Sequence, residues 1–521
     1  MESSFRRSMD WLHTWAGIIF GALLFAIFWM GTLAVFDREI DRWMLPMTRR
    51  AAVESAISFE QLRPFLDTAA AVKAPNWSVV FPTDRQLVPS VHWRKGEEQI
   101  RRYLDPATGI PLPGPGSWAG SQFLYPFHYM LHIKLWQLGM WIVGLAAMAM
   151  LALCVSGIVI HRTLIADFFT FRTRGKPLQP ILDLHNVTGV LGLPFHVLIT
   201  LSGLIIFFAN YFPIGWQATY PTREAFNADA FGTYSRPKLK QPGSLASLDE
   251  MMREAQRRWQ GEAPSQLTVF HPGDAAAYVR VVRLTHDRVT RQVDSVYFDG
   301  ATGQLLQQNS ALRPVMTTQR FISGLHFIQF RHWTLRWLYF VLGLSGCVLI
   351  ATGSLFWMET RRERHARSNL SGVRLVEGVT IGSVTGLILA TLAFFVSNRL
   401  LPLEATLLGY DRAALEVWIF YLTWLITFAH AWLRLKQAWI EQCRAISGLA
   451  IAAVFFNWLT TGDHLVSSLA SRELWPVAGM DLLLLVSALT AWLAAQKLRY
   501  RTVPHQPRHE AMPVAEPQGF G

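Results

Sequence analysis

The sequence predicts a polytopic α-helical membrane protein of about eight spanning helices, with two α+β modules outside the membrane and an internal duplication. The chain has 521 residues, of which 51% are hydrophobic and 16% are charged. Its mean hydropathy is +0.23, which is unusual for a soluble protein of this length. The net charge of +12 lies in short blocks between apolar runs. That distribution indicates membrane topology and argues against a nucleic-acid-binding protein.

Eight apolar segments approach the roughly 20 residues that a helix needs to cross a bilayer. They cover residues 14–35, 135–160, 185–209, 335–357, 376–398, 414–433, 445–461 and 477–495. The fifth is the weakest, because it is rich in Gly, Ser and Thr. The first also has features of a signal peptide, since Arg6 and Arg7 precede it and "TLA" resembles a cleavage site. Its length and its place in the duplication favour a structural helix.

The loops between these segments alternate between basic and balanced charge, which places the basic loops and both termini in the cytoplasm. Two long hydrophilic regions then fall on the other side of the membrane. The predicted domains are a first helix (1–36), a first module (37–127), helices two and three (128–212), a second module (213–323), a fourth helix (324–360), a four-helix C-terminal region (361–498) and a disordered tail (499–521).

The two modules have the same order of predicted elements. In the first, the helix "SFEQLRPFLDTAAA" precedes the strands "SVVF" and "SVHWR" and the hairpin "RRYLDPATGIPL". In the second, the helix "SLASLDEMMREAQRRW" precedes "QLTVF", "AYVRVVRL" and the hairpin "SVYFDGATGQLL". Asp and Thr-Gly in each hairpin suit a tight turn with glycine at positive φ.

Matching residues at fixed spacing indicate that the first four helices are two copies of one unit. The hairpins match at an offset of 194, which also takes His132 onto His326: Tyr103 with Tyr297, Asp105 with Asp299, Thr108 with Thr302 and Gly109 with Gly303. The first and third apolar segments match at a different offset, 172. Both begin on the cytoplasmic side and share the pattern H-x3-G-x13-G, which pairs His13 with His185, Gly17 with Gly189 and Gly31 with Gly203. We therefore expect a pseudo-two-fold axis along the membrane normal.

Such an axis sets equivalent histidines opposite each other, His13 facing His185 and His132 facing His326. Two neutral imidazoles that approach from opposite sides are the usual axial ligands of a b-type haem in a helical bundle. We expect two haem b groups with these four residues as iron ligands. None of the three cysteines lies in a haem-attachment motif, so the haems would be held non-covalently.

His196 has no symmetry partner, because the equivalent position is Leu24. Eleven residues make about three helical turns, so His196 shares a face with His185 and lies deeper in the membrane. It is an alternative ligand of the second haem, or a hydrogen-bond donor to a propionate or a quinone. His128, four residues before His132, is either a ligand or a residue near the substrate, and we favour the latter.

The sequence resembles the PepSY-associated transmembrane family, also called the iron-regulated or PiuB-like membrane proteins. The resemblance lies in "WLHTWAG", "LDLHNVTG", "MLHIKLW", "GLHFIQF", "YLDPATG" and "YFDGATG", with "GIVIHR", "DFFTFR" and "LPFHVLITLSG" as further blocks. It covers about residues 5–360. The resemblance assigns no site to the last four helices, whose role stays open.

The resemblance implies a bacterial inner-membrane protein with periplasmic PepSY modules, similar to ferric-siderophore reductases. Electrons would then pass from the cytoplasmic side through two haems to a ferric siderophore or another periplasmic ferric complex, near His128, Tyr125 and Lys134. The sequence has no nucleotide-binding glycine motif. The donor is therefore expected to be a separate cytoplasmic reductase or a quinol.

Two other functions compete with this reductase. The first is a non-enzymatic sensor or accessory protein of iron uptake, whose modules bind proteins or peptides and whose histidines are structural. The second is a metal transporter that uses His128, His132 and His326. The transporter is disfavoured because the first four spans lack an internal Asp or Glu for coupling.

Overall fold

The structure is a computed structural model. The structure describes all residues except 1–2, 51–57, 61, 63–65, 67–73, 97, 162–177, 285–287, 292, 310–311, 329, 367–370 and 503–521. Most of the helix predicted over 58–71, most of the basic loop from His161 to Pro177 and most of the predicted tail fall outside the described residues.

Eight helices within the described residues are long and apolar enough to cross a membrane, as the sequence predicts. They are α1 (Ser3–Ala34), α5 (Leu138–Ile160), α7 (Leu178–Ile206), α13 (Trp333–Ala366), α14 (Ser371–Leu400), α15 (Arg412–Leu433), α16 (Leu435–Thr461) and α18 (Trp475–Thr502). Most extend well beyond the apolar segments, because polar residues continue each helix past its hydrophobic part.

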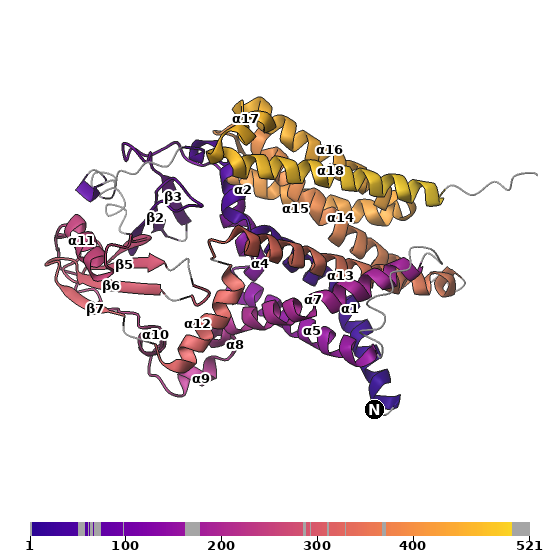
Figure 1. Ribbon diagram of the computed structural model, residues 1–521, viewed down its shortest axis with the longest axis horizontal. Coiled ribbons are helices and arrows are strands. Elements are labelled where there is room, and N and C mark those ends of the chain that lie inside the picture. Colours follow the sequence, from indigo (N-terminus) through magenta and orange to yellow (C-terminus); the bar gives the residue numbers. More distant parts are fainter. Residues whose placement is uncertain are drawn as a thin grey trace, which may run out of the picture.

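These helices form two groups that lie side by side (Figure 1). In the first, α1, α5, α7 and α13 pack on one another; in the second, α14 packs on α15 and α16, and α16 packs on α18. Helix α14, which contains the weakest apolar segment, is the most buried of the eight helices. In α14, 78% of the apolar part is buried inside the protein, against 22% in α5. Its glycine, serine and threonine residues are explained by close packing between helices, which small side chains allow.

The strands of both modules join into one antiparallel sheet of seven strands, in the order β3-β2-β1-β4-β5-β6-β7. The strands are β1 (Asn76–Val80), β2 (Ser90–Lys95), β3 (Glu98–Tyr103), β4 (Gln266–Phe270), β5 (Tyr278–Leu284), β6 (Val293–Asp299) and β7 (Leu305–Gln308). The modules meet where β1 pairs with β4, with Ser78 opposite Thr268. The sequence predicts the strands but not this junction.

The core of the joined sheet draws on both modules. Trp77 and Val79 of β1 are buried with Leu267 and Val269 of β4, and α11 (Leu248–Arg258) adds Met251 to the same cluster. Alternate residues of β1, β2, β4, β5 and β6 point into this core, which is the usual pattern for a sheet with one covered face. Neither module therefore closes its core alone among the described residues.

The two predicted hairpin turns have the expected geometry. Asp105 accepts hydrogen bonds from the backbone of Ala107 and Thr108, and Asp299 accepts them from Ala301 and Thr302. Gly109 and Gly303 have φ of 71° and 74°, a region that glycine enters without a side-chain clash.

Short elements connect the sheet to the long helices. They are α2 (Asp37–Met44), η1 (Pro46–Thr48), η2 (Gly120–Leu124), α4 (Tyr125–Met130), η3 (Leu135–Gln137), α8 (Phe208–Tyr211), α9 (Pro213–Gln217), α10 (Arg223–Phe231) and α12 (Pro314–Phe327). Others connect the C-terminal helices to one another: β8 (Thr406–Leu407), β9 (Tyr410–Asp411), α17 (Leu465–Ala470) and η4 (Arg472–Leu474). The sheet lies at one end of the long helices, and the N-terminus lies at the other (Figure 1). We call these two ends the sheet side and the terminal side.

Candidate functional site

A cavity of about 470 Å³ lies among the first four long helices and extends toward the sheet side. Its deeper wall is apolar and includes Leu24, Phe28, Ala147 and Met150. Two histidines, His128 and His326, line the cavity, and its outer rim is polar. An apolar chamber with a few converging polar groups is the usual form of a cofactor or ligand site.

On the terminal side, the structure brings together the predicted pair His13 and His185. Their ring centroids are 6.4 Å apart and their planes are 84° apart. The Nδ1 atom of His13 lies 3.1 Å from the Leu153 carbonyl oxygen in α5, and Nδ1 of His185 lies 2.9 Å from the Leu349 carbonyl oxygen in α13. Each ring is therefore held by the helix that packs against its own.

On the sheet side, the partner of His326 is His128. The ring centroids of this pair are 5.9 Å apart and the planes are 27° apart. The Nδ1 atom of His128 lies 2.9 Å from the Ile27 carbonyl oxygen in α1, and Nδ1 of His326 lies 2.8 Å from the Ile199 carbonyl oxygen in α7. The sheet-side pair is thus held by the same kind of Nδ1 contact as the terminal-side pair, although the angle between its ring planes is smaller.

The predicted pairing of His132 with His326 does not occur. His132 turns toward the C-terminal helices, where Nδ1 lies 2.9 Å from the Tyr421 hydroxyl oxygen. Its Nε2 lies 2.8 Å from the Phe123 carbonyl oxygen, so both ring nitrogens are engaged. Helix α4 ends at Met130, and His132 adopts φ of 56°, which turns the chain away from the cavity. His128, four residues earlier, is still on the helix and faces inward.

The four paired imidazoles share one hydrogen-bonding pattern. Each places Nδ1 on a backbone carbonyl oxygen, which can only accept, so Nδ1 carries the proton and Nε2 keeps a free lone pair. Among the described residues, none of the four Nε2 atoms has a hydrogen-bond partner. A carbonyl that fixes the tautomer and the direction of the ring is the usual support of a metal-binding histidine.

The spacing of each pair suits a metal held from both sides. With metal–nitrogen bonds of about 2 Å, two imidazoles on one ion have centroids about 6 Å apart. The observed separations are 6.4 and 5.9 Å. Among the described residues there is no group of three or more His, Cys, Asp or Glu that could hold a metal ion. Pairs of imidazoles without further ligands fit a haem, whose porphyrin fills the other positions.

Each paired histidine also lies against a glycine of a neighbouring helix. An ideal Cβ on Gly31 would lie 2.6 Å from the His128 ring, and one on Gly203 would lie 3.0 Å from the His326 ring. Gly157 and Gly353 have the same relation to His13 and His185, at 3.4 and 3.0 Å. The sequence pattern identifies Gly31 and Gly203 but misses Gly157 and Gly353, for which only membership of an apolar segment is visible.

His196 lies on α7 between His185 and Ile199, the residue that anchors His326. Its side chain is fully buried and packs against Phe28, with ring centroids 5.9 Å apart. Neither ring nitrogen makes a hydrogen bond of the usual distance and angle among the described residues, although the ring interacts with the backbone of Leu342. His196 does not line the cavity, so the structure brings it near the sheet-side pair without making it part of that pair.

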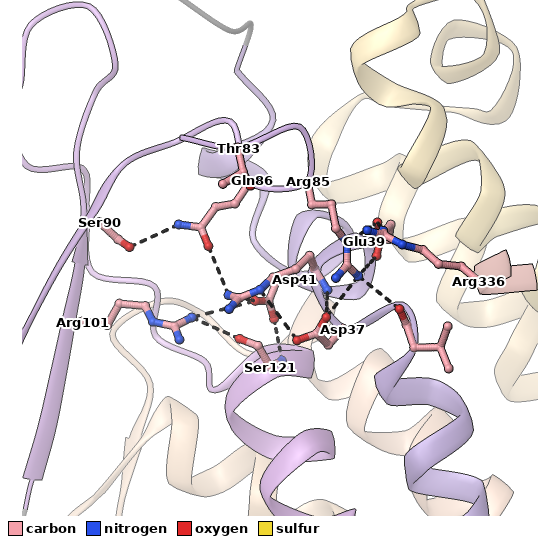
Figure 2. A network of polar contacts seen from close by, with 12 residues as sticks. Asp37, Glu39, Asp41, Thr83, Arg85, Gln86, Ser90, Arg101, Ser121 and Arg336 are labelled. Carbon is pink, nitrogen blue, oxygen red and sulfur yellow. Dashed lines mark hydrogen bonds and ion pairs between the residues drawn. The ribbon is translucent and has the colours of Figure 1, made fainter. Parts of the chain in front are cut away.

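A network of charged side chains lies at the sheet-side rim of the cavity, and Figure 2 shows its contacts. Arg85 pairs with Glu39 at 2.6 Å and with Asp37 at 3.2 Å, and Arg336 reaches Glu39 at 3.3 Å. Burial lowers the pKa of Arg85, but the two carboxylates outweigh it and hold the pKa above its usual value. This network, which sequence reasoning missed, joins α2, the first module and α13.

Asp41 occupies the other half of this network (Figure 2). It accepts a hydrogen bond from the Ser121 backbone at 2.8 Å and lies 3.8 Å from the Arg101 guanidinium. Burial raises the pKa of Asp41 above its usual value, although Arg38 and Arg101 oppose the shift. Of the residues expected near a substrate, Tyr125 lines the cavity, whereas Lys134 is exposed and lies outside it.

The C-terminal helices contact residues that surround the site. Glu416 of α15 is fully buried and accepts hydrogen bonds from Ser117 and Asn398. Asp481 of α18 accepts a hydrogen bond of 2.8 Å from the Trp43 indole of α2. These helices thus support the segments that carry the rim of the cavity.

Comparison with known proteins places these features in a family. The sequence model of the PepSY-associated TM region matches residues 11–360, which include all four paired histidines. The chain is also similar to an uncharacterised protein of Pseudomonas aeruginosa, with 27% identity over 281 residues. That match covers 50% of this chain and 69% of the relative.

Proposed function

Because the chain belongs to the family defined by the PepSY-associated TM region, a family of multi-pass membrane proteins, we propose that it is a haem-containing transmembrane reductase. The observation that carries the proposal is the presence of two imidazole pairs with free Nε2 atoms at two depths. His13 and Ile27 are 14 residues apart on α1, so the two levels are separated by about 21 Å along the helix.

His13 with His185, and His128 with His326, would be the axial ligands. When bound, a haem b at each pair would supply reversible one-electron chemistry. The chain's own residues orient the ligands: the carbonyl groups of Leu153, Leu349, Ile27 and Ile199 fix the Nδ1 protons. Glycines 157, 353, 31 and 203 leave room beside the four rings. The apolar wall of the cavity would surround much of a haem at the sheet-side pair.

The proposed direction of electron flow is from the terminal side to the sheet side. We assign the terminal side to the bacterial cytoplasm, since the basic loops lie there, and the sheet to the periplasm. A separate cytoplasmic reductase or a quinol would be oxidised, and a periplasmic ferric siderophore complex would take up one electron per iron. Ferrous iron is held less firmly by hard oxygen ligands, so reduction would release it.

A reduced-minus-oxidised absorbance spectrum of the purified full chain, with a haem-to-protein ratio, tests this function. We expect b-type Soret and α bands, close to two haems per chain, and reoxidation of the dithionite-reduced protein when a ferric complex is added. Protein made with ample haem that shows no such bands contradicts the reductase. It would favour a sensor whose histidines are structural.

A further inference from the structure

Within the part of the chain that the structure describes, one arginine at the rim of the cavity has no acidic partner, unlike the other three. Arg38, Arg85 and Arg101 line the rim and form ion pairs with Asp37, Glu39 or Asp41. Arg291, in the loop between β5 and β6, lines the same rim. Among the described residues its guanidinium forms no hydrogen bond or ion pair, and its Nε is buried without a partner. Burying a guanidinium without a partner costs free energy, and a bound anion would offset that cost.

The position of Arg291 is fixed by its surroundings. Its guanidinium carbon lies 3.7 Å from the centroid of the ring of Phe327, the residue that follows His326 in the sequence. Its backbone N–H donates a hydrogen bond to the Arg320 carbonyl oxygen. Burial lowers the pKa of Arg291, and burial followed by Arg291 itself lowers the pKa of Arg320 to about 10. Two close cations that disfavour each other make this part of the rim attractive to a negative charge.

Tyr125 adds a neutral donor to the same rim. It lines the cavity, and its phenol interacts electrostatically with Arg291. Desolvation raises its pKa to about 12, so the O–H group keeps its proton at neutral pH. The hydroxyl has no hydrogen-bond partner among the described residues. A planar cation and a hydroxyl donor together match the acceptor geometry of a carboxylate.

We propose that Arg291 and Tyr125 form a carboxylate-binding subsite at the sheet-side rim of the cavity. The carboxylate has two sources: a propionate of a haem held by His128 and His326, which rests on the proposed function, or an acidic group of a ferric complex from solution. Arg291 comes from the second module and Tyr125 from α4. The subsite would thus tie the sheet to the helices that carry the sheet-side histidines.

The experiment compares the full-length wild-type protein with the variants Arg291→Gln, Arg291→Lys and Tyr125→Phe. Arg288→Gln is the matched control, because Arg288 lies three residues earlier in the same loop and is exposed. Thermal unfolding in detergent verifies that each variant is folded. If Arg291→Gln does not fold, Arg291→Lys and Tyr125→Phe carry the test, since they keep the charge and the aromatic ring, respectively.

The first measurement detects a haem propionate. Resonance Raman bending bands of the propionates shift when their hydrogen bonds change, and a lost positive charge lowers the midpoint potential of the nearby haem. With a propionate in the subsite, Arg291→Gln and Tyr125→Phe shift the propionate band, and Arg291→Gln lowers one of the two potentials. Arg288→Gln leaves both unchanged.

The second measurement detects a soluble carboxylate. Equilibrium dialysis of the oxidised protein against ferric citrate, with a ferric trihydroxamate complex that lacks free carboxylates as reference, reports binding. With an external carboxylate in the subsite, Arg291→Gln binds ferric citrate at least tenfold more weakly and binds the trihydroxamate as the wild type does.

A folded Arg291→Gln protein that equals Arg288→Gln in both measurements overturns the subsite. The proposed function fails separately, if the wild type contains no haem. In that case the citrate measurement alone decides: tenfold weaker binding supports the subsite, and unchanged binding overturns it.

Discussion

His128 and His326 lie with their ring centroids 5.9 Å apart, although 198 residues separate them in the chain. Each is held through Nδ1 by a carbonyl of the helix that carries a terminal-side histidine, Ile27 of α1 and Ile199 of α7. Ile27 and Ile199 are 172 residues apart, as are His13 and His185. The matching contacts accord with the predicted duplication, which itself stays a prediction.

Replacing His128 by alanine is expected to remove about half of the bound haem, because His326 alone cannot hold an iron from both sides. His132→Ala is the matched control, since its imidazole bonds to Tyr421 and Phe123 and should leave the haem content unchanged. Haem per chain after gel filtration in detergent gives the measurement. A protein that loses haem with His132→Ala and keeps it with His128→Ala would restore the pairing predicted from the sequence.

The register of the second pair shows where sequence reasoning stopped. The string Leu-His occurs at 131–132 and at 325–326, which gives the offset of 194. In the structure, the carbonyl acceptors of His13 and His185 are Leu153 and Leu349, an offset of 196, and the histidines that pair are 198 apart. The offset therefore changes from 194 to 198 between the hairpins and the paired histidines, and from 198 to 196 between those histidines and the carbonyl acceptors in α5 and α13. Two shared letters cannot reveal such a shift.

The glycines beside the rings provide an independent test of the sheet-side site. Gly31→Ala is expected to weaken haem binding there, because its Cβ would lie 2.6 Å from the His128 ring. Overpacking of this kind costs about 1–3 kcal/mol. Gly17→Ala on the same helix is the control, since its Cβ would meet only Leu153 at 3.9 Å. Haem titration of both variants makes the comparison, and equal affinities would argue against a close fit.

The fold was more predictable than the contacts between its parts. Apolar length identified all eight long helices, and alternation with turn residues identified the strands of both modules. The joining of β1 to β4 leaves no local pattern, because an edge strand and an inner strand read alike in sequence. The rim pairs such as Arg336 with Glu39 are equally hidden, since they link residues almost 300 positions apart.

His196 is expected to be dispensable for haem binding and to carry a cost in stability. A buried polar group without a partner costs about 1–3 kcal/mol, and an apolar replacement of similar shape removes that cost. His196→Leu, which copies the equivalent Leu24, should therefore keep both haems and unfold at a higher temperature. Loss of one α band in this variant would instead identify His196 as an axial ligand.

The first module is expected to lose stability in acid because of His92. Burial, followed by repulsion from Arg101 and Arg38, lowers the pKa of His92 from the usual 6.5 to about 3. The folded state therefore prefers the neutral ring, so the stability contribution is full above pH 6.5 and is lost as the pH falls toward 3. His92→Gln should flatten the decline in thermal unfolding temperature between pH 7 and pH 4. An unchanged decline would assign it to other groups.

The C-terminal helices are expected to brace the site without binding a haem. Glu416 is fully buried and receives hydrogen bonds from Ser117 and Asn398, with the Arg412 guanidinium 3.3 Å away. Glu416→Ala would leave Arg412 buried without its carboxylate, which costs about 3–5 kcal/mol. Glu416→Gln should cost less, because the amide can still accept a hydrogen bond from Ser117.

Both variants should keep the wild-type haem content, because Glu416 lies away from the two histidine pairs. Denaturant unfolding, followed by tryptophan fluorescence, measures the stability, and the pyridine-treated absorbance spectrum measures the haem. If folded Glu416→Gln protein loses haem from one site, the contact from α15 to Ser117 positions His128, which lies four residues after the end of η2. The C-terminal helices would then belong to the site rather than to its support.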